Sequence, residues 1–204
     1  MTIKTKQSEF WRGEFGLQYT QRNLIDYKKR IAFFKKILSL TDGVKSVLEI
    51  GANRGHNLKA FLEIDPLLDI HGLELNDTAF ECLGQVPNIH AYRGSVHDFQ
   101  PDRTFDIVFT CGVLIHINPD LLAKVYEQML HWSAKYILVC EYFSPRPEII
   151  QYGGEKDTLF KRDFASEILD MASGKLNVID YGFLWRRLEP TWDDVNWFLM
   201  RKNP

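Results

Sequence analysis

Residues 47–57, VLEIGANRGHN, decide the fold of this chain. The apolar run ends in a turn that contains Gly51 and Gly55, and a second apolar run, IHGLELN, follows at 70–76. Gly51 allows a tight turn with no Cβ between the backbone and a ligand, and Gly55 allows the next helix to pack closely. The pattern predicts a buried strand, a glycine turn, a helix and a second strand, which is the start of a nucleoside-binding α/β unit.

An acidic residue completes this unit. Glu74 lies near the end of the second apolar run, about 20 residues after the turn, where a carboxylate can accept both hydroxyls of a ribose. From Glu49 onward the turn reads E-x-G-x-x-x-G, with Asn53 in place of the second glycine of G-x-G-x-x-G. That glycine motif surrounds a pyrophosphate with backbone N–H groups. The sequence therefore predicts a nucleoside-bearing ligand without a pyrophosphate cradle.

Further strands follow in an order typical of one fold class. FDIVFTCGVLIHI at 105–117 has an acid entering an apolar strand, and YILVCEYF at 136–143 is a fifth buried strand. VIDYGFLWRR at 178–187 and NWFLMRK at 196–202 are typical of a closing pair of strands. Strands separated by helix-length segments favour an α/β fold. We expect a Rossmann-like, seven-stranded, mostly parallel sheet with helices on both faces and ligands at the carboxyl ends of its strands.

These motifs, with GSVHDF at 94–99, resemble those of class I S-adenosylmethionine-dependent methyltransferases. The resemblance implies S-adenosylmethionine as the cofactor, its amino acid part at the glycine turn and its adenine beside 94–99. Many members have Asp where this chain has Ser95, so the adenine amino group is left to Ser95, the backbone of Val96, or Asp98. The cofactor-binding residues that we expect are Trp11, Arg22, Glu49, Gly51, Asn53, Gly55, Glu74, Leu75, Ser95, Val96 and Cys111.

The first 40 residues precede this core. We expect helices near 7–20 and 23–39, and one methyltransferase domain over 1–204 with a Rossmann-like core at 45–204. Trp11, Phe15 and Tyr19 recur at helical spacing, so one face of the first helix could cover the cofactor as a lid, and the alternative is core packing. The basic residues Lys28, Lys29, Arg30, Lys35 and Lys36 are expected on the solvated face of the second helix.

Two segments point to a narrower family. FWRGEFGLQYTQRN at 10–23 and YGGEKDTLFKRDFA at 152–165 resemble the methylases associated with pseudaminic acid biosynthesis, a bacterial family of about this length. The second segment belongs to a stretch, 144–162, that is predicted to be loop because prolines and glycines punctuate it, and a helix is expected at 163–172. The resemblance implies a small-molecule methyltransferase encoded near sugar-biosynthesis functions and does not fix the acceptor.

The chemistry needs close positioning and a dry pocket more than it needs catalytic groups. His116, Tyr19 and Tyr142 are the catalytic candidates. His116 titrates near neutrality and would serve as a base for a hydroxyl acceptor, whereas a neutral amine needs none, and the alternative is a histidine packed in its loop. The candidate acceptor-binding residues are Asn23, Glu141, Lys161 and Arg162.

Geometry and charge suggest how these residues would act. Neighbours on a strand face opposite sides, so one of Glu141 and Tyr142 should face the acceptor. Lys161 and Arg162 could clamp a carboxylate or phosphate, or they could simply begin a helix that Asp163 caps.

Composition limits the class of protein. A net charge of -2 and a pI near 6.3 give no general attraction to nucleic acid. No segment approaches the roughly 20 apolar residues of a membrane span, and the N-terminus lacks the apolar core of a signal peptide. Three cysteines form no framework, which suits a reducing cytoplasm. We expect a small-molecule substrate, no metal, nucleic acid or membrane partner, and no particular oligomeric state.

Two other classes of protein stay open. A nucleotide-dependent oxidoreductase or epimerase would also use βαβ architecture, although the phosphate-binding fingerprint is missing here. A non-catalytic binding or scaffold module would keep the fold but would have less need of both Gly51 and Glu74.

Overall fold

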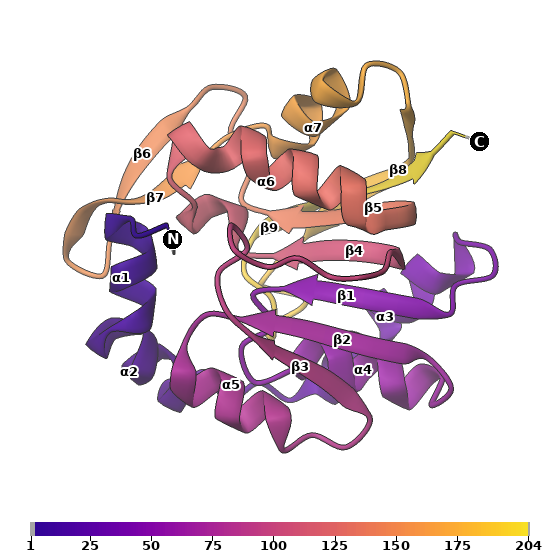
Figure 1. Ribbon diagram of the computed structural model, residues 1–204, viewed down its shortest axis with the longest axis horizontal. Coiled ribbons are helices and arrows are strands. Elements are labelled where there is room, and N and C mark those ends of the chain that lie inside the picture. The colour runs from indigo at the N-terminus through magenta and orange to yellow at the C-terminus, as the bar shows by residue number, and fades with distance from the viewer. Residues whose placement is uncertain (1–2, 204) are drawn as a thin grey trace.

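A computed structural model describes residues 3–203 of the chain. Its main strands are β1 (Ser46–Ile50), β2 (Asp69–Glu74), β3 (Ile89–Arg93), β4 (Phe105–Cys111), β5 (Ser133–Glu141), β8 (Leu176–Leu184) and β9 (Val195–Lys202). In the described residues they form one seven-stranded sheet in the order β3-β2-β1-β4-β5-β9-β8 (Figure 1). The first five strands pair in parallel, and β9 is antiparallel to both of its neighbours. The predicted Rossmann-like sheet is confirmed.

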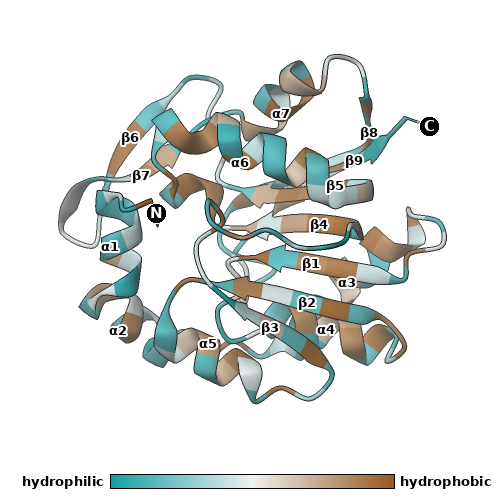
Figure 2. Cartoon of the chain, in the orientation of Figure 1, coloured by the Kyte–Doolittle hydropathy of each residue, from teal (hydrophilic) through white to brown (hydrophobic). Residues whose placement is uncertain are grey.

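Helices cover both faces of this sheet. The covering helices are α3 (Ile31–Ser39), α4 (His56–Ile64), α5 (Asp77–Gly84), α6 (Pro119–Trp132) and α7 (Phe164–Ala172). The chain also has α1 (Lys6–Arg12), α2 (Glu14–Arg22) and short 3₁₀ turns η1 (Tyr27–Arg30) and η2 (Leu114–His116). Figure 2 shows apolar residues along the central strands and polar residues on the outward sides of the helices. This pattern is what a sheet buried on both faces requires.

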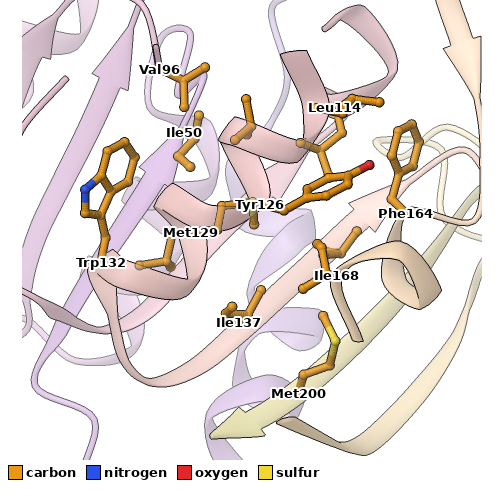
Figure 3. Close-up of a cluster of buried hydrophobic side chains, with 14 of the residues drawn as sticks. Ile50, Val96, Leu114, Tyr126, Met129, Trp132, Ile137, Phe164, Ile168 and Met200 are labelled. Atoms are coloured by element: carbon orange, nitrogen blue, oxygen red, sulfur yellow. The ribbon is translucent and has the colours of Figure 1, made fainter. Parts of the chain in front are cut away.

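Two apolar clusters hold the layers together. On one face of the sheet, Phe34 and Phe61 of α3 and α4 pack with Phe109 of β4. On the other face, α6 and α7 close over the sheet through residues such as Trp132 and Ile168 (Figure 3). The helices thereby fix the strands rigidly, so their carboxyl ends present a defined edge to a ligand.

The N-terminal segment lies at that edge. In Figure 1, α1 and α2 stand beyond the arrowheads of β1, β2 and β4, and a two-stranded hairpin, β6 (Glu148–Tyr152) and β7 (Glu155–Lys161), lies beside α1. The side-chain Nε2 of Gln7 in α1 donates to the carbonyl of Asp157 in β7 at 2.8 Å. No helix in the described part of the chain is long and apolar enough to cross a membrane.

Two predictions about these segments are wrong in detail. The helix expected at 7–20 is broken at Gly13, whose extended backbone (φ -81°, ψ -160°) ends α1 and starts α2. The stretch 144–162, expected to be loop, contains the β6–β7 hairpin. Gly153 and Gly154 connect its strands with φ of 61° and 82°, which suits a two-residue turn of the type that Gly-Gly favours. The expected helix at 163–172 is present, and Asp163 caps it.

Candidate functional site

A cavity of about 230 Å³ opens where β1, β2, β4 and β5 end. Its wall combines the turns after β1 and β2 with α1, α2, the strand-four loop (112–118, between β4 and α6) and the segment before β9 (185–194). The predicted site residues that line it are Trp11, Tyr19, Asn23, Glu49, Gly51, Asn53, Glu74, Leu75, Ser95, Val96, Cys111, His116 and Tyr142. The structure therefore brings most of the predicted residues to one place, although they come from separate parts of the chain.

The glycine turn has the shape that its sequence demands. Gly51 has a φ of 72°, and its N–H donates to the carbonyl of Leu73 at 2.8 Å. A Cβ at Gly51 would lie 2.5 Å from Cγ2 of Val113. Gly55 also has a positive φ, of 74°, but it stands outside the cavity wall, and a Cβ there would lie 2.8 Å from Leu83 of α5. Gly51 thus borders the cavity, whereas Gly55 lets α4 and α5 pack closely.

Glu74 is buried at the end of β2 and joins two turns. Its Oε2 accepts the N–H of Asn53 at 2.7 Å, and its Oε1 accepts the N–H of Asn76 at 2.7 Å. Burial raises the pKa of Glu74, and these backbone hydrogen bonds partly oppose the rise. Each carboxylate oxygen has a second lone pair. Glu74 can therefore hold the turns in place and still accept hydrogen bonds from a ligand in the cavity.

Glu49 lies at the base of the cavity with one oxygen free. It is 2% exposed, Oε1 accepts the side-chain N–H of Asn57 at 2.6 Å, and Oε2 has no hydrogen-bond partner in the structure. Asn57 in turn accepts from Arg30 at 2.5 Å, and the guanidinium of Arg30 lies 4.2 Å from the ring of Trp192. Burial raises the pKa of Glu49 to about 8. An unpartnered buried carboxylate oxygen in a cavity wall is well suited to a cationic or hydrogen-donating ligand.

Arg30 corrects one expectation. The sequence predicts a solvated position for Arg30, and this is wrong, because Arg30 is 7% exposed and forms part of the cavity wall. The helical spacing misled the prediction because η1 precedes α3 and turns Arg30 inward, toward Asn57 and the carbonyl of Thr191.

The pKa of Glu49 leads to a prediction about stability. The unfolded chain releases this proton near pH 4.5, whereas the folded chain retains it until about pH 8. The resulting stabilisation is complete below the unfolded pKa and is lost as pH rises through the folded pKa. Burial also lowers the pKa of His116, from 6.5 to about 4, which works in the opposite direction but only below about pH 6.5. Between pH 7 and 8 we expect the free energy of unfolding to fall by about 1 kcal/mol.

Denaturant titrations at pH 7.0, 7.5 and 8.0 check this, with Glu49→Gln as the matched variant that has no proton to release. In the variant the fall over the same range should be smaller by about 1 kcal/mol, and the part that remains includes Glu141, whose pKa burial raises to about 7. Equal slopes for the two proteins would contradict the assignment.

His116 sits between the cavity and the hairpin. Its Nδ1 lies 2.9 Å from the carbonyl of Thr158, and because a carbonyl only accepts, Nδ1 carries the proton. Its ring packs against Trp11 and Tyr152 at centroid distances of 4.6 and 5.3 Å. With its pKa lowered to about 4 by burial, His116 is neutral at pH 7 and a weak base. His116 thus lines the cavity and also packs the strand-four loop, and its role as a base stays a prediction.

The neighbours Glu141 and Tyr142 face opposite sides, as strand geometry requires. Tyr142 lines the cavity. Glu141 points away from it, and its Oε1 accepts the N–H groups of Val113 and Leu114 at 3.0 and 3.1 Å. Burial raises the pKa of Glu141 to about 7. Its carboxyl therefore shapes the strand-four loop, and Tyr142 is the member of the pair that can meet an acceptor.

Three basic residues of the predicted site stand outside the cavity wall. Arg22 lies over the rings of Phe15 and Tyr19, at 5.2 and 5.6 Å from their centroids. Lys161 lies 5.4 Å from the ring centroid of Tyr142, and Arg162 pairs with Glu167 at 2.7 Å. The geometry gives no direct support to an anion clamp at Lys161 and Arg162, so that role stays a prediction.

The segment before β9 supplies residues that the sequence analysis missed. Trp192 and Asp193 line the cavity, and burial, followed by the charge of nearby Asp193, raises the pKa of Tyr142. Their motif, TWDD, looks like an ordinary loop. The pairing of the strands explains their position, because β9 runs antiparallel to β5 and Glu141 pairs with Asn196. The residues before β9 must therefore arrive at the carboxyl end of β5.

The fold of this chain is shared, at low sequence identity, with solved structures of methyltransferases. No protein-family model matches the chain, and no curated protein does. The glycopeptide N-methyltransferase MtfA with bound S-adenosyl-L-homocysteine has a TM-score of 0.65 at 12% identity, over 94% of this chain and 99% of its own. CalS10, an amino pentose methyltransferase from Micromonospora echinaspora with bound SAM, has a TM-score of 0.66 at 12% identity, over 100% of this chain and 99% of its own. The plantazolicin methyltransferase BpumL with SAH has a TM-score of 0.66 at 15% identity, over 97% of this chain and 94% of its own.

Proposed function

We propose that this chain is an S-adenosylmethionine-dependent methyltransferase that acts on an oxygen or nitrogen atom of a small molecule. One observation carries the proposal: the Gly51 turn and the buried carboxylates of Glu49 and Glu74 face the same cavity. The solved structures named above, which share the fold, contain this cofactor or its product and so support the proposal.

The residues present fit the cofactor. Glu74 would accept the ribose hydroxyls, and the free Oε2 of Glu49 would accept the ammonium of the methionine part. Gly51 leaves the space that a Cβ would fill. Ser95 and Val96, both buried, would border adenine. When bound, the cofactor supplies a methyl group already activated by its sulfonium, so the protein needs mainly to align the acceptor and exclude water.

A direct binding experiment separates this function from the alternatives. Calorimetry with S-adenosylhomocysteine and with NAD should show binding of the first alone, because the turn has Asn53 where a pyrophosphate site needs glycine. Binding of NAD without S-adenosylhomocysteine would instead establish an oxidoreductase or epimerase. A non-catalytic module would bind S-adenosylhomocysteine and transfer no methyl group to any acceptor.

The acceptor class is the finer part of the proposal. We propose a sugar or nucleotide-sugar related to nonulosonic acid biosynthesis, on the resemblance of segments 10–23 and 152–165 to the pseudaminic acid-associated methylases. The likeness to an amino pentose methyltransferase is compatible with a sugar acceptor. Purified protein with labelled S-adenosylmethionine, screened against sugars, nucleotide-sugars and small amines, tests this choice.

We also propose that residues 1–204 act as one domain in which α1 and α2 form a lid. Trp11 and Tyr19 line the cavity, and the carbonyl of Trp11 accepts the side-chain N–H of Asn76 at 2.9 Å. Lids of this kind order when a ligand binds. Hydrogen exchange over residues 8–23 should slow on addition of S-adenosylhomocysteine, while exchange in α7, remote from the cavity wall, should stay unchanged. Identical exchange of residues 8–23 in both states would refute a lid.

A further inference from the structure

One part of the cavity wall is rich in phenols. Tyr19 of α2, Tyr142 after β5 and Tyr152 of β6 all line it, together with Asp193 from the segment before β9. We call these four residues the tyrosine pocket. Burial, and after it the charge of nearby Asp193, raises the pKa of Tyr142. Burial, and after it the charges of nearby groups that include Asp193, raises the pKa of Tyr19 to about 12, so the phenols stay neutral.

In the described part of the chain, acidic side chains of the cavity wall outnumber arginine and lysine. Among the residues that the structure describes, its acidic side chains are Glu49, Glu74 and Asp193, and Arg30 is its one arginine or lysine. Arg30 is already engaged by Asn57, Thr191 and Trp192. The histidines of the wall with shifted pKa values, His56, His97 and His116, all have them lowered by burial, which favours their neutral forms. Glu49 is largely protonated at pH 7, so the exposed carboxylate of Asp193 is the acidic group that a ligand entering from solvent meets first. It favours a ligand that presents a cationic group there.

A carboxylate beside aromatic rings, as in the tyrosine pocket, is the combination that recognises an ammonium group. Ring faces attract cations, and a carboxylate accepts their charged N–H groups. Asp193 is exposed in this structure, so it can meet an acceptor that enters from solvent. An alcohol acceptor would need a good base, and the wall offers a weak one in His116. An amine would need none once it has lost a proton to water.

Resting on the function proposed above, we propose that the methyl acceptor is a small molecule with a primary or secondary amino group, which Asp193 binds inside the tyrosine pocket. The ammonium form first gives one proton to solvent. The nitrogen lone pair then forms a bond to the methyl carbon, and the carbon–sulfur bond breaks with its electron pair on sulfur. The nitrogen thereby regains a positive charge, which Asp193 faces until a proton leaves to water.

The test is a matched pair of probes that share a benzyl group, one with an ammonium at pH 7 and the other with a neutral hydroxyl. Benzylamine and benzyl alcohol are titrated by nuclear magnetic resonance into the full chain saturated with S-adenosylhomocysteine. We expect benzylamine to bind at least ten-fold more tightly at pH 7. Asp193→Asn should abolish this preference. Asp194→Asn should keep it, because Asp194 lies in the same segment but outside the cavity wall and accepts the N–H of Arg186 at 2.9 Å.

Each result decides the proposal. Equal affinity for the two probes, no detectable binding of either, or a preference that survives in Asp193→Asn would overturn it. S-adenosylhomocysteine is bound first and its affinity is measured separately. Failure of that first binding would count against the proposed methyltransferase function, whereas failure of the benzylamine preference alone counts against an amine acceptor.

Discussion

Replacement of Glu74 by Ala should weaken the binding of S-adenosylhomocysteine by about 2 to 4 kcal/mol, or roughly 30- to 800-fold. The variant loses two charge-assisted hydrogen bonds to ribose. It also releases the N–H groups of Asn53 and Asn76, which the carboxylate holds at 2.7 Å each. Calorimetry measures the affinity, and Glu81→Ala on the exposed side of α5 serves as a control with the same change of charge.

A second pair of ligands separates the ribose contact from the effect on the turns. 5′-Methylthioadenosine and its 2′,3′-dideoxy analogue differ in the ribose hydroxyls. The wild-type chain should favour the first, and Glu74→Ala should bind both equally, because the coupling between side chain and hydroxyls is then absent. If Glu74→Ala kept the wild-type preference, the carboxylate would have no role in binding ribose.

The parts of the fold that sequence predicted well are those with strong local causes. The apolar runs at 47–50 and 70–73 are fully buried strands, and a continuous apolar run is what parallel strands covered on both faces require. The turn between β1 and α4 needs glycine for its positive φ, so its position was visible in the sequence.

The hairpin shows where a local signal was misread. Proline and glycine in 144–162 suggested loop, yet Gly153 and Gly154 form the turn between β6 and β7. The hairpin is stabilised by hydrogen bonds from residues distant in the sequence. The side chain of Gln7 donates to the carbonyl of Asp157, and that of His116 donates to the carbonyl of Thr158. Contacts of this range leave no periodic trace in the segment itself.

The candidate site also contains residues that the sequence predicted and residues that it did not. The residues at the glycine turn and Glu74 follow from motifs, whereas Arg30 and Asp193 reach the cavity only through tertiary packing. Arg30 had helical neighbours that suggested a solvated face, and its buried position depends on Asn57 and Trp192, far along the chain. Prediction from spacing alone therefore finds the part of a site that is built from consecutive residues.

The second large effect is expected at Gly51. In Gly51→Ala the new Cβ would approach Cγ2 of Val113 to 2.5 Å, at a φ of 72° that a residue with a side chain rarely adopts. The cost is on the order of 1 to 3 kcal/mol for the strained backbone alone. Relief of the collision would move the turn or the strand-four loop, and both line the cavity. We expect S-adenosylhomocysteine to bind at least ten-fold more weakly, together with a lower unfolding midpoint.

Two variants distinguish collision from backbone strain. Gly43→Ala places a Cβ at a φ of 56°, where its nearest contact would be Nζ of Lys135 at 3.7 Å, remote from the cavity wall. It should lower stability through strain and leave the affinity for S-adenosylhomocysteine unchanged. Adding Val113→Ala to Gly51→Ala removes the colliding methyl group and should restore part of the affinity. If Gly51→Ala bound as tightly as the wild-type chain, close approach of the turn to the ligand would not be needed, and the cofactor would have to lie elsewhere in the cavity.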